Sequence, residues 1–131
     1  MAGEPILVVD DNEANSDLLT FLLETTGYQV RAATDADEAL KILEAFTPRL
    51  IMMDLQLPGM DGLTLTKKLK ADPLTRDIII VALTAYAMKG DDERAREAGC
   101  DGYVSKPIDT RTLPLTVADL LRAQNAMREK T

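Results

Sequence analysis

Histidine and tryptophan are absent from this 131-residue chain, and cysteine occurs once. Without histidine, the chain cannot use Ser-His-Asp or Cys-His catalysis. It cannot carry a phosphohistidine either, so any phosphoryl group on it must come from another molecule. The single Cys100 cannot form an internal disulfide. It suits a reducing cytoplasm, and we expect it to behave as a small buried hydrophobe.

Long apolar runs and an excess of positive charge are also missing. No stretch approaches the roughly 20 apolar residues that span a bilayer, and no secretory signal is visible. The net charge of −7 and the pI of about 4.5 argue against a nucleic-acid surface and against docking on anionic lipid. We therefore expect a cytoplasmic protein that binds neither nucleic acid nor membrane.

The residues that are present fit one small domain. The chain is long enough to bury a core but too short for a second globular unit. We expect one domain over residues 1–124, followed by a short polar tail at 125–131 that frays. Apolar runs alternate with segments of helical periodicity throughout, which predicts a (βα)₅ pattern and a doubly wound parallel sheet.

The expected elements follow from apolar spacing and from Gly, Pro and capping residues. The expected strands are Pro5–Asp10, Tyr28–Ala33, Arg49–Met53, Ile78–Leu83 and Asp101–Ser105. The expected helices are Glu13–Thr26, Asp35–Phe46, Gly62–Lys70, Met88–Glu97 and Leu115–Arg122. The more polar second strand should lie at an edge. Pro114 should fall in the first turn of the last helix, since a deeper proline would break it.

Chemistry-bearing residues follow the apolar runs. Asp10 and Asp11 end the first strand, Asp54 follows the third, Thr84 the fourth and Lys106 the fifth. In open α/β sheets the carboxyl ends of the strands form the binding edge, so these side chains should converge there. Close carboxylates repel one another unless a cation lies between them, and Mg²⁺ is the natural hard cation for oxygen ligands. Acids, metal and lysine together are the parts of a phosphoryl-transfer site.

Each residue also has a plainer structural interpretation. Asp10 and Asp11 could cap the following helix, Thr84 could cap another, and Lys106 could be a surface lysine with Pro107 an ordinary helix-preceding proline. A phosphohydrolase of the haloacid-dehalogenase type would need a second acid two residues after Asp54, where Gln56 stands. A flavodoxin-like cofactor binder would need a phosphate-binding turn where the two aspartates stand.

Four segments in order resemble the receiver domains of two-component response regulators, over essentially the whole chain. They are Leu7-Val8-Val9-Asp10-Asp11-Asn12, Met53-Asp54-Leu55-Gln56-Leu57-Pro58-Gly59-Met60-Asp61-Gly62, Leu83-Thr84-Ala85 and Ser105-Lys106-Pro107. The stretch from Thr84 to Asp91 most resembles stand-alone regulators of the DivK type, and it is also similar to receivers fused to hybrid kinases. The resemblance implies a chemotaxis-type, flavodoxin-like three-layer sandwich with strand order 2-1-3-4-5.

The resemblance also implies a phosphoacceptor and a metal. Asp54 would be the carboxylate nucleophile that forms an aspartyl phosphate. Asp11, Asp54 and the backbone carbonyl of Gln56 would coordinate Mg²⁺, and Asp10 would act largely through metal-bound water. Any further turnover would be slow hydrolysis of the aspartyl phosphate, so no separate enzyme activity is expected.

Phosphoryl binding and switching would fall to other residues. The resemblance assigns the phosphoryl oxygens to the Thr84 hydroxyl, the Ala85 amide and the Lys106 ammonium. It makes Thr84 and Tyr103 the switch, and it implies a cis peptide between Lys106 and Pro107. The segment Met88–Glu97 offers little apolar area, so it could be a solvated surface helix, an element free to shift, or both.

The function implied is that of a stand-alone response regulator in a phosphorelay. A histidine kinase or a histidine phosphotransfer protein would phosphorylate it, and it would signal by binding a downstream protein, as a monomer or a weak dimer. The alternative is a receiver excised from a hybrid histidine kinase or a larger regulator. The wide arc of leucines in the first helix predicts a phosphodonor contact near Asn15, Leu18, Leu19 and Leu22.

Overall fold

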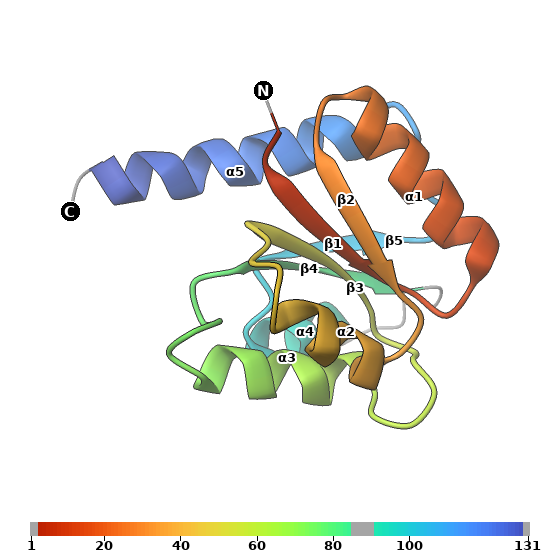
Figure 1. Ribbon diagram of the computed structural model, residues 1–131, viewed down its shortest axis with the longest axis vertical. Coiled ribbons are helices and arrows are strands. Elements are labelled where there is room, and N and C mark those ends of the chain that lie inside the picture. Colours follow the sequence, from red (N-terminus) through yellow and green to blue (C-terminus); the bar gives the residue numbers. More distant parts are fainter. Residues whose placement is uncertain (1–2, 85–90, 130–131) are drawn as a thin grey trace.

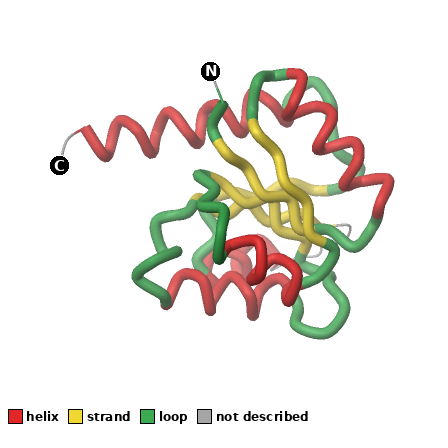
Figure 2. Tube along the Cα trace, in the orientation of Figure 1, coloured by secondary structure: helices red, strands yellow, loops and turns green. Residues whose placement is uncertain are grey.

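The computed structural model describes residues 3–84 and 91–129 and shows a three-layer α/β sandwich (Figure 1). Five parallel strands form one sheet in the order β2-β1-β3-β4-β5. Helices α1 and α5 lie on one face of the sheet, while α2, α3 and α4 lie on the other (Figures 1 and 2). The predicted fold class and strand order are thereby confirmed, with the polar second strand at an edge.

The element bounds lie close to those predicted. The strands are β1 Pro5–Val9, β2 Gln29–Ala33, β3 Leu50–Asp54, β4 Ile79–Thr84 and β5 Gly102–Ser105. The helices are α1 Glu13–Thr25, α2 Ala36–Leu43, α3 Gly62–Ala71, α4 Asp91–Ala98 and α5 Leu113–Glu129. Pro114 falls in the first turn of α5, as predicted. No helix among the described residues combines the length and apolar character needed to cross a bilayer.

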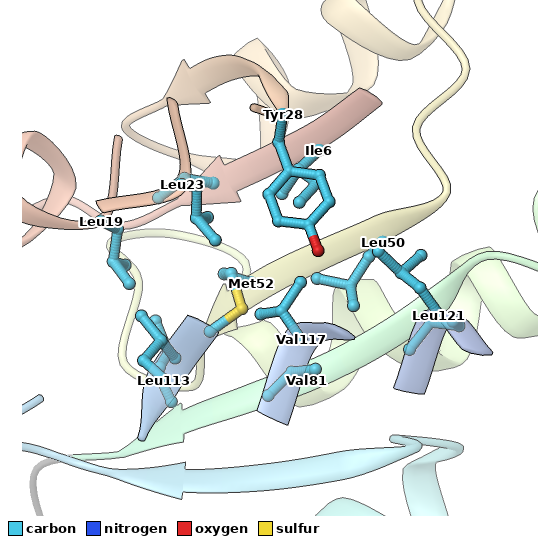
Figure 3. Close-up of a cluster of buried hydrophobic side chains, with 13 residues drawn as sticks. Ile6, Leu19, Leu23, Tyr28, Leu50, Met52, Val81, Leu113, Val117 and Leu121 are labelled. Carbon is cyan, nitrogen blue, oxygen red and sulfur yellow. The ribbon is translucent and has the colours of Figure 1, made fainter. Parts of the chain in front are cut away.

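The core has two halves, because β1, β3 and β4 are buried on both faces of the sheet. Alternate strand residues point to opposite faces, so Met52 belongs to one half and Met53 to the other. On the α1/α5 face, Leu113 and Val117 of α5 pack near Met52 and the ring of Tyr28 (Figure 3). Buried alanines and leucines of α2 and α3 fill the opposite face.

Helix α5 is the main departure from the predicted bounds. It continues to Glu129, so the expectation that the tail at 125–131 frays is wrong for residues 125–129, and the end of the helix extends past the sheet (Figures 1 and 2). The Arg49 guanidinium donates to Gln124 Oε1, through Nε at 3.0 Å and Nη2 at 2.8 Å, and also to Asn125 Oδ1. Gln124 Nε2 in turn donates to the carbonyl of Asp77 at 2.6 Å. These contacts hold the helix against the edge where β3 and β4 begin.

Helices α2 and α4 also differ from expectation. Helix α2 ends at Leu43, three residues before the predicted Phe46. Helix α4 is described from Asp91 onward, and the first part of the predicted Met88–Glu97 segment lies outside the described residues. Its inner face contributes the buried Ala95 and Ala98, so α4 rests on two small side chains. For the described part of this helix, the predicted small apolar area is confirmed.

Candidate functional site

The carboxyl ends of the strands bring the predicted residues to one edge of the sheet. Asp54 and Thr84 are the last residues of β3 and β4, while Asp10 directly follows β1 and Lys106 follows β5. Parallel pairing aligns these ends, since Val9 pairs with Met53 and Asp54 pairs with Leu83. The sheet register therefore places side chains from four strands around one point.

Three carboxylates form the centre of this edge. Asp10, Asp11 and Asp54 each offer one oxygen, and the three oxygens lie within 4.8 Å of one another. Asp10 and Asp54 are almost fully buried, whereas Asp11 is exposed. The cluster is thus an acidic site in which two carboxylates are buried and the third, that of Asp11, is open to solvent.

Lys106 is the counter-charge of the cluster. Its Nζ donates to Asp54 Oδ2 at 3.1 Å and lies 3.2 Å from Asp10 Oδ2. The backbone N–H of Lys106 donates to the carbonyl of Thr84 at 2.7 Å, which fixes the start of the side chain beside β4. The Lys106–Pro107 peptide bond is cis. One ammonium faces three carboxylates, so the site keeps an excess of negative charge.

Burial and charge shift both partners of the central ion pair. Burial raises the pKa of Asp54; the Gln56 amide N–H and Lys106 oppose this shift, and the charge of Asp10 adds to it. Burial alone would lower the pKa of Lys106, but its hydrogen bond with Asp54 and the charges of Asp54 and Asp10 outweigh burial and leave that pKa raised. Lys106 therefore stays protonated, and the carboxylates of Asp10 and Asp54 still lie close enough to repel each other.

One buried oxygen lacks a hydrogen bond. Asp10 Oδ1 accepts from the Asn12 amide at 2.9 Å, but Asp10 Oδ2 accepts no hydrogen bond among the described residues. Its one charged neighbour is the Lys106 ammonium at 3.2 Å, which Asp54 shares, so this buried oxygen is only partly satisfied. Oxygen donors, an excess of negative charge and this buried oxygen all suit a hard divalent cation.

The loop after β3 is held tightly against the site. The Gln56 amide donates to Asp54 Oδ1 at 2.9 Å, and the Leu55 amide donates to the carbonyl of Leu83 at 3.0 Å. Gly62 begins α3 so close to this loop that an added Cβ would lie 2.2 Å from the Asp54 carbonyl oxygen. Only glycine fits there; sequence reasoning placed Gly62 at the start of the predicted helix but did not predict this close contact.

Several plainer interpretations disagree with the structure. Asn12, and neither aspartate before it, caps α1 by accepting from the Asn15 amide at 3.0 Å. Thr84 is the buried last residue of β4, and the residues between it and α4 lie outside the described part of the chain, so its predicted role as a cap stays a prediction. The side chain of Lys106 is only 13% exposed, which excludes an ordinary surface lysine. Ala85 lies outside the described residues.

Two further predicted residues surround the site. Gln56 is exposed on the loop after Asp54. Its amide side chain carries no proton that could serve a phosphohydrolase as general acid. Tyr103 lies half-buried in β5. It borders a hollow of about 280 Å³ against α4 and another of about 250 Å³ toward the start of α5.

Known proteins share this fold and much of this sequence. Residues 6–118 match the family model of the response regulator receiver domain. The polar-differentiation response regulator DivK of Brucella anthropi is 43% identical over 116 residues, which are 88% of this chain and 94% of that protein. A CheY-like receiver domain protein from Methanospirillum hungatei superposes with a TM-score of 0.88 at 31% identity, over 96% of this chain and 99% of the other.

A third relative comes from a sensor kinase. The receiver domain of a sensor histidine kinase from Pseudomonas aeruginosa, solved with a magnesium ion in its active-site cleft, is 33% identical with a TM-score of 0.83. The match covers 92% of this chain and 98% of that domain. The chain belongs to the response regulator receiver domain family of two-component systems. It resembles both free-standing regulators and a receiver that is part of a kinase.

Proposed function

We propose that Asp54 accepts a phosphoryl group from a phosphohistidine of a histidine kinase or a histidine phosphotransfer protein, and that the phosphorylated chain binds a downstream protein. The observation that carries this proposal is the buried Asp54 carboxylate, which lies beside Asp11 and is hydrogen-bonded to Lys106. Membership of the receiver family and the likeness to DivK support a stand-alone regulator.

In the transfer step, a carboxylate oxygen of Asp54 attacks phosphorus and the phosphorus–nitrogen bond of the donor breaks. The bonding electron pair returns to the imidazole nitrogen, so no oxidant or reductant is needed. Lys106 balances the charge on the transferring group, with the Thr84 hydroxyl and the Ala85 amide as the other donors. Such a reaction depends mainly on positioning and on charge neutralisation, which fixed donors supply.

Asp11, Asp54 and the Gln56 carbonyl would hold Mg²⁺, and Asp10 would hold one of its waters. When bound, Mg²⁺ neutralises the carboxylates and polarises the phosphoryl oxygens. Asp10 Oδ2 is buried and accepts no hydrogen bond among the described residues, although it is ion-paired with Lys106 at 3.2 Å; a metal-bound water could donate to it, which supports this assignment. The magnesium ion in the Pseudomonas receiver supports it as well.

Labelling with acetyl phosphate, followed by mass spectrometry, tests whether Asp54 is the residue that accepts the phosphoryl group. The wild type should gain one phosphoryl group on Asp54 in Mg²⁺ and none in a chelator, while Asp54→Asn should gain none. The same label appearing on Asp10 or Asp61 would overturn the assignment. In a Mg²⁺ titration, Asp11→Asn should bind the ion far more weakly than the wild type, and equal affinities would remove the metal from the proposal.

The outer side of α1 is the proposed contact for the phosphodonor. Leu19 is fully buried in the core, so its predicted place in that contact is wrong. Leu18 and Leu22 are half-buried, and Phe21 is 64% exposed on the same side of the helix, which sequence reasoning missed. Phe21→Ala and Leu18→Ala should each slow transfer from a phosphorylated donor protein and leave labelling by acetyl phosphate unchanged.

Phosphorylation of Asp54 would change the position of the Tyr103 side chain in β5. The transferred group adds negative charge beside Thr84, and movement of this residue toward it would leave room for the Tyr103 ring, which borders two hollows. Full switching from 1:99 to 99:1 needs about 5.5 kcal/mol of differential interaction. A few charge-assisted hydrogen bonds of roughly 1.5–3 kcal/mol each can supply this. Amide exchange with beryllofluoride, a phosphoryl mimic, should change mainly between Thr84 and Lys106; changes confined to 34–47 would place the output surface elsewhere.

A further inference from the structure

An exposed apolar surface lies at the edge of the sheet opposite the acidic site, where the strands begin. Here the carboxyl ends of α2 and α3 and the connections that follow them enclose a groove of about 410 Å³. We call it the α2–α3 groove. Its apolar lining is Leu40, Leu43, Phe46, Leu69, Leu74 and Ile78. In Figure 1 the connection after α3 lies at the far end of that helix from the loop that follows Asp54. The groove is therefore separate from the acidic site.

Leu74 projects from the rim of this groove. This residue is 86% exposed, the largest exposure of a bulky apolar residue among those described. The turn that carries it is firmly held: Asp72 Oδ1 accepts from the Leu74 amide at 2.9 Å, and the Thr75 hydroxyl donates to the Leu69 carbonyl at 2.6 Å. Lys70 Nζ fixes the end of the turn by donating to the Ile78 carbonyl at 2.7 Å. An exposed leucine on a rigid turn is a preorganised anchor for an interface.

Charged residues of both signs line the groove, and Asp72 at the end of α3 is a further acid among them. Glu44 lies at the end of α2 and Lys68 on α3, and both line the groove. Both side chains are exposed, and among the described residues neither takes part in an ion pair. A twofold axis along the groove would place α3 of each copy over α2 of the other, so Lys68 of one copy would face Glu44 of the other. A twofold axis across the groove would oppose like charges.

We propose that the α2–α3 groove is a self-association surface, in which Leu74 of each copy enters the groove of a second copy of this chain. A twofold interface requires one patch to be complementary to itself. This patch meets the requirement, because it carries a projecting leucine beside an apolar recess and both signs of unpaired charge. The surface is small, so the dimer is weak and forms at high protein concentration.

Sedimentation velocity of the full chain, from about 20 μM to about 1 mM, tests the proposal in a range where weak dimers appear. The wild type should shift from monomer to dimer. Leu74→Ser should raise the dimer dissociation constant by roughly 100-fold, since two leucines leave each dimer and each contributes about tenfold or more. The matched control is Leu115→Ser, another leucine that is 63% exposed but lies on α5; it should associate like the wild type.

Exchanging the charges of Glu44 and Lys68 tests the proposed orientation of the two copies. Lys68→Glu and Glu44→Lys should each weaken association, and the double variant should restore it. Asp54→Asn should dimerise like the wild type, so failure of the phosphorylation proposal leaves this one intact. A wild type that stays monomeric at the highest concentration would overturn the proposal, and so would equal association of wild type and Leu74→Ser. Binding of a small apolar dye by a monomeric wild type, lost in Leu74→Ser, would assign the groove to a small ligand and also overturn it.

Discussion

Replacing Asp10 by asparagine should stabilise the metal-free protein, although Asp10 is a fully buried residue in an ion pair. Asparagine has nearly the same shape and keeps an oxygen for the Asn12 amide. What the substitution removes is one buried negative charge. Its effect on the free energy of unfolding is the balance of three terms: attraction to Lys106, repulsion from the other carboxylates, and the cost of burying the charge.

The first two terms nearly offset each other. At an effective dielectric constant of about 20, the Lys106 ammonium at 3.2 Å attracts Asp10 by about 5 kcal/mol. The Asp54 carboxylate, within 4.8 Å, repels it by at least about 3.5 kcal/mol. Exposed Asp11 adds a repulsion that solvent screens. The desolvation penalty of a buried carboxylate, several kcal/mol, therefore decides the sign. We expect a net gain of about 2 kcal/mol, which raises Tm by roughly 6–10 °C.

Urea denaturation measures this gain in two conditions. In a chelator, Asp10→Asn should unfold at higher urea than the wild type with an unchanged slope. In Mg²⁺ the wild type should gain stability by mass action and the variant should gain less, so that the difference shrinks or reverses. Asp17→Asn, an exposed substitution on α1, controls for the loss of one charge far from the cluster. A metal-free Asp10→Asn protein that is less stable than the wild type would refute the reasoning.

Three further predictions concern the frame around the site. Gly62→Ala should lower the free energy of unfolding by at least about 3 kcal/mol, because the added Cβ meets only backbone atoms. Gly59→Ala should lower it by about 1 kcal/mol, since Gly59 has open space around it but a φ of +73°. Equal urea midpoints for the two variants would contradict the contact at Gly62. Arg49→Met should lower the amide protection of the last turns of α5 and leave that of α1 unchanged, so uniform protection would show that the helix end holds by itself. Cys100 is half-buried, and burial raises the pKa of its thiol, so iodoacetamide at about pH 8 should modify it more slowly than a free cysteine and at the ordinary rate in urea; equally rapid modification of the folded protein would contradict the raised pKa.

The edge of the sheet that carries the site was predictable because local sequence determines it. A polar residue after a short apolar run marks a strand end, and parallel pairing brings strand ends together whatever the loop lengths. This reasoning located Asp54, Thr84 and Lys106 correctly. It could not show which oxygen of Asp10 lacks a donor, or that Asn12 caps α1, since both depend on the exact path of the chain.

Features that depend on distant contacts escaped sequence reasoning. The end of α5 looked like a polar tail, and its helix is held by Arg49, which lies 75 positions before Gln124 in the chain. The exposure of Phe21 depends on which side of α1 meets the sheet, and four leucines in that helix gave no unique answer. The α2–α3 groove is built from two connections far apart in sequence, and Leu74 alone gave no sign of it.

The lengths of the strands keep the two proposed surfaces apart. Each central strand has five or six residues, so about 17 Å of sheet separates the acidic edge from the edge that carries the groove. Substitutions more than about 7–10 Å apart usually act additively when they share no partner. Leu74→Ser should therefore leave Asp54 labelling by acetyl phosphate unchanged, and Asp54→Asn should leave self-association unchanged. A measured coupling between the two would mean that α3 transmits the state of the site, because its first residue packs against the Asp54 carbonyl while its last turn lines the groove.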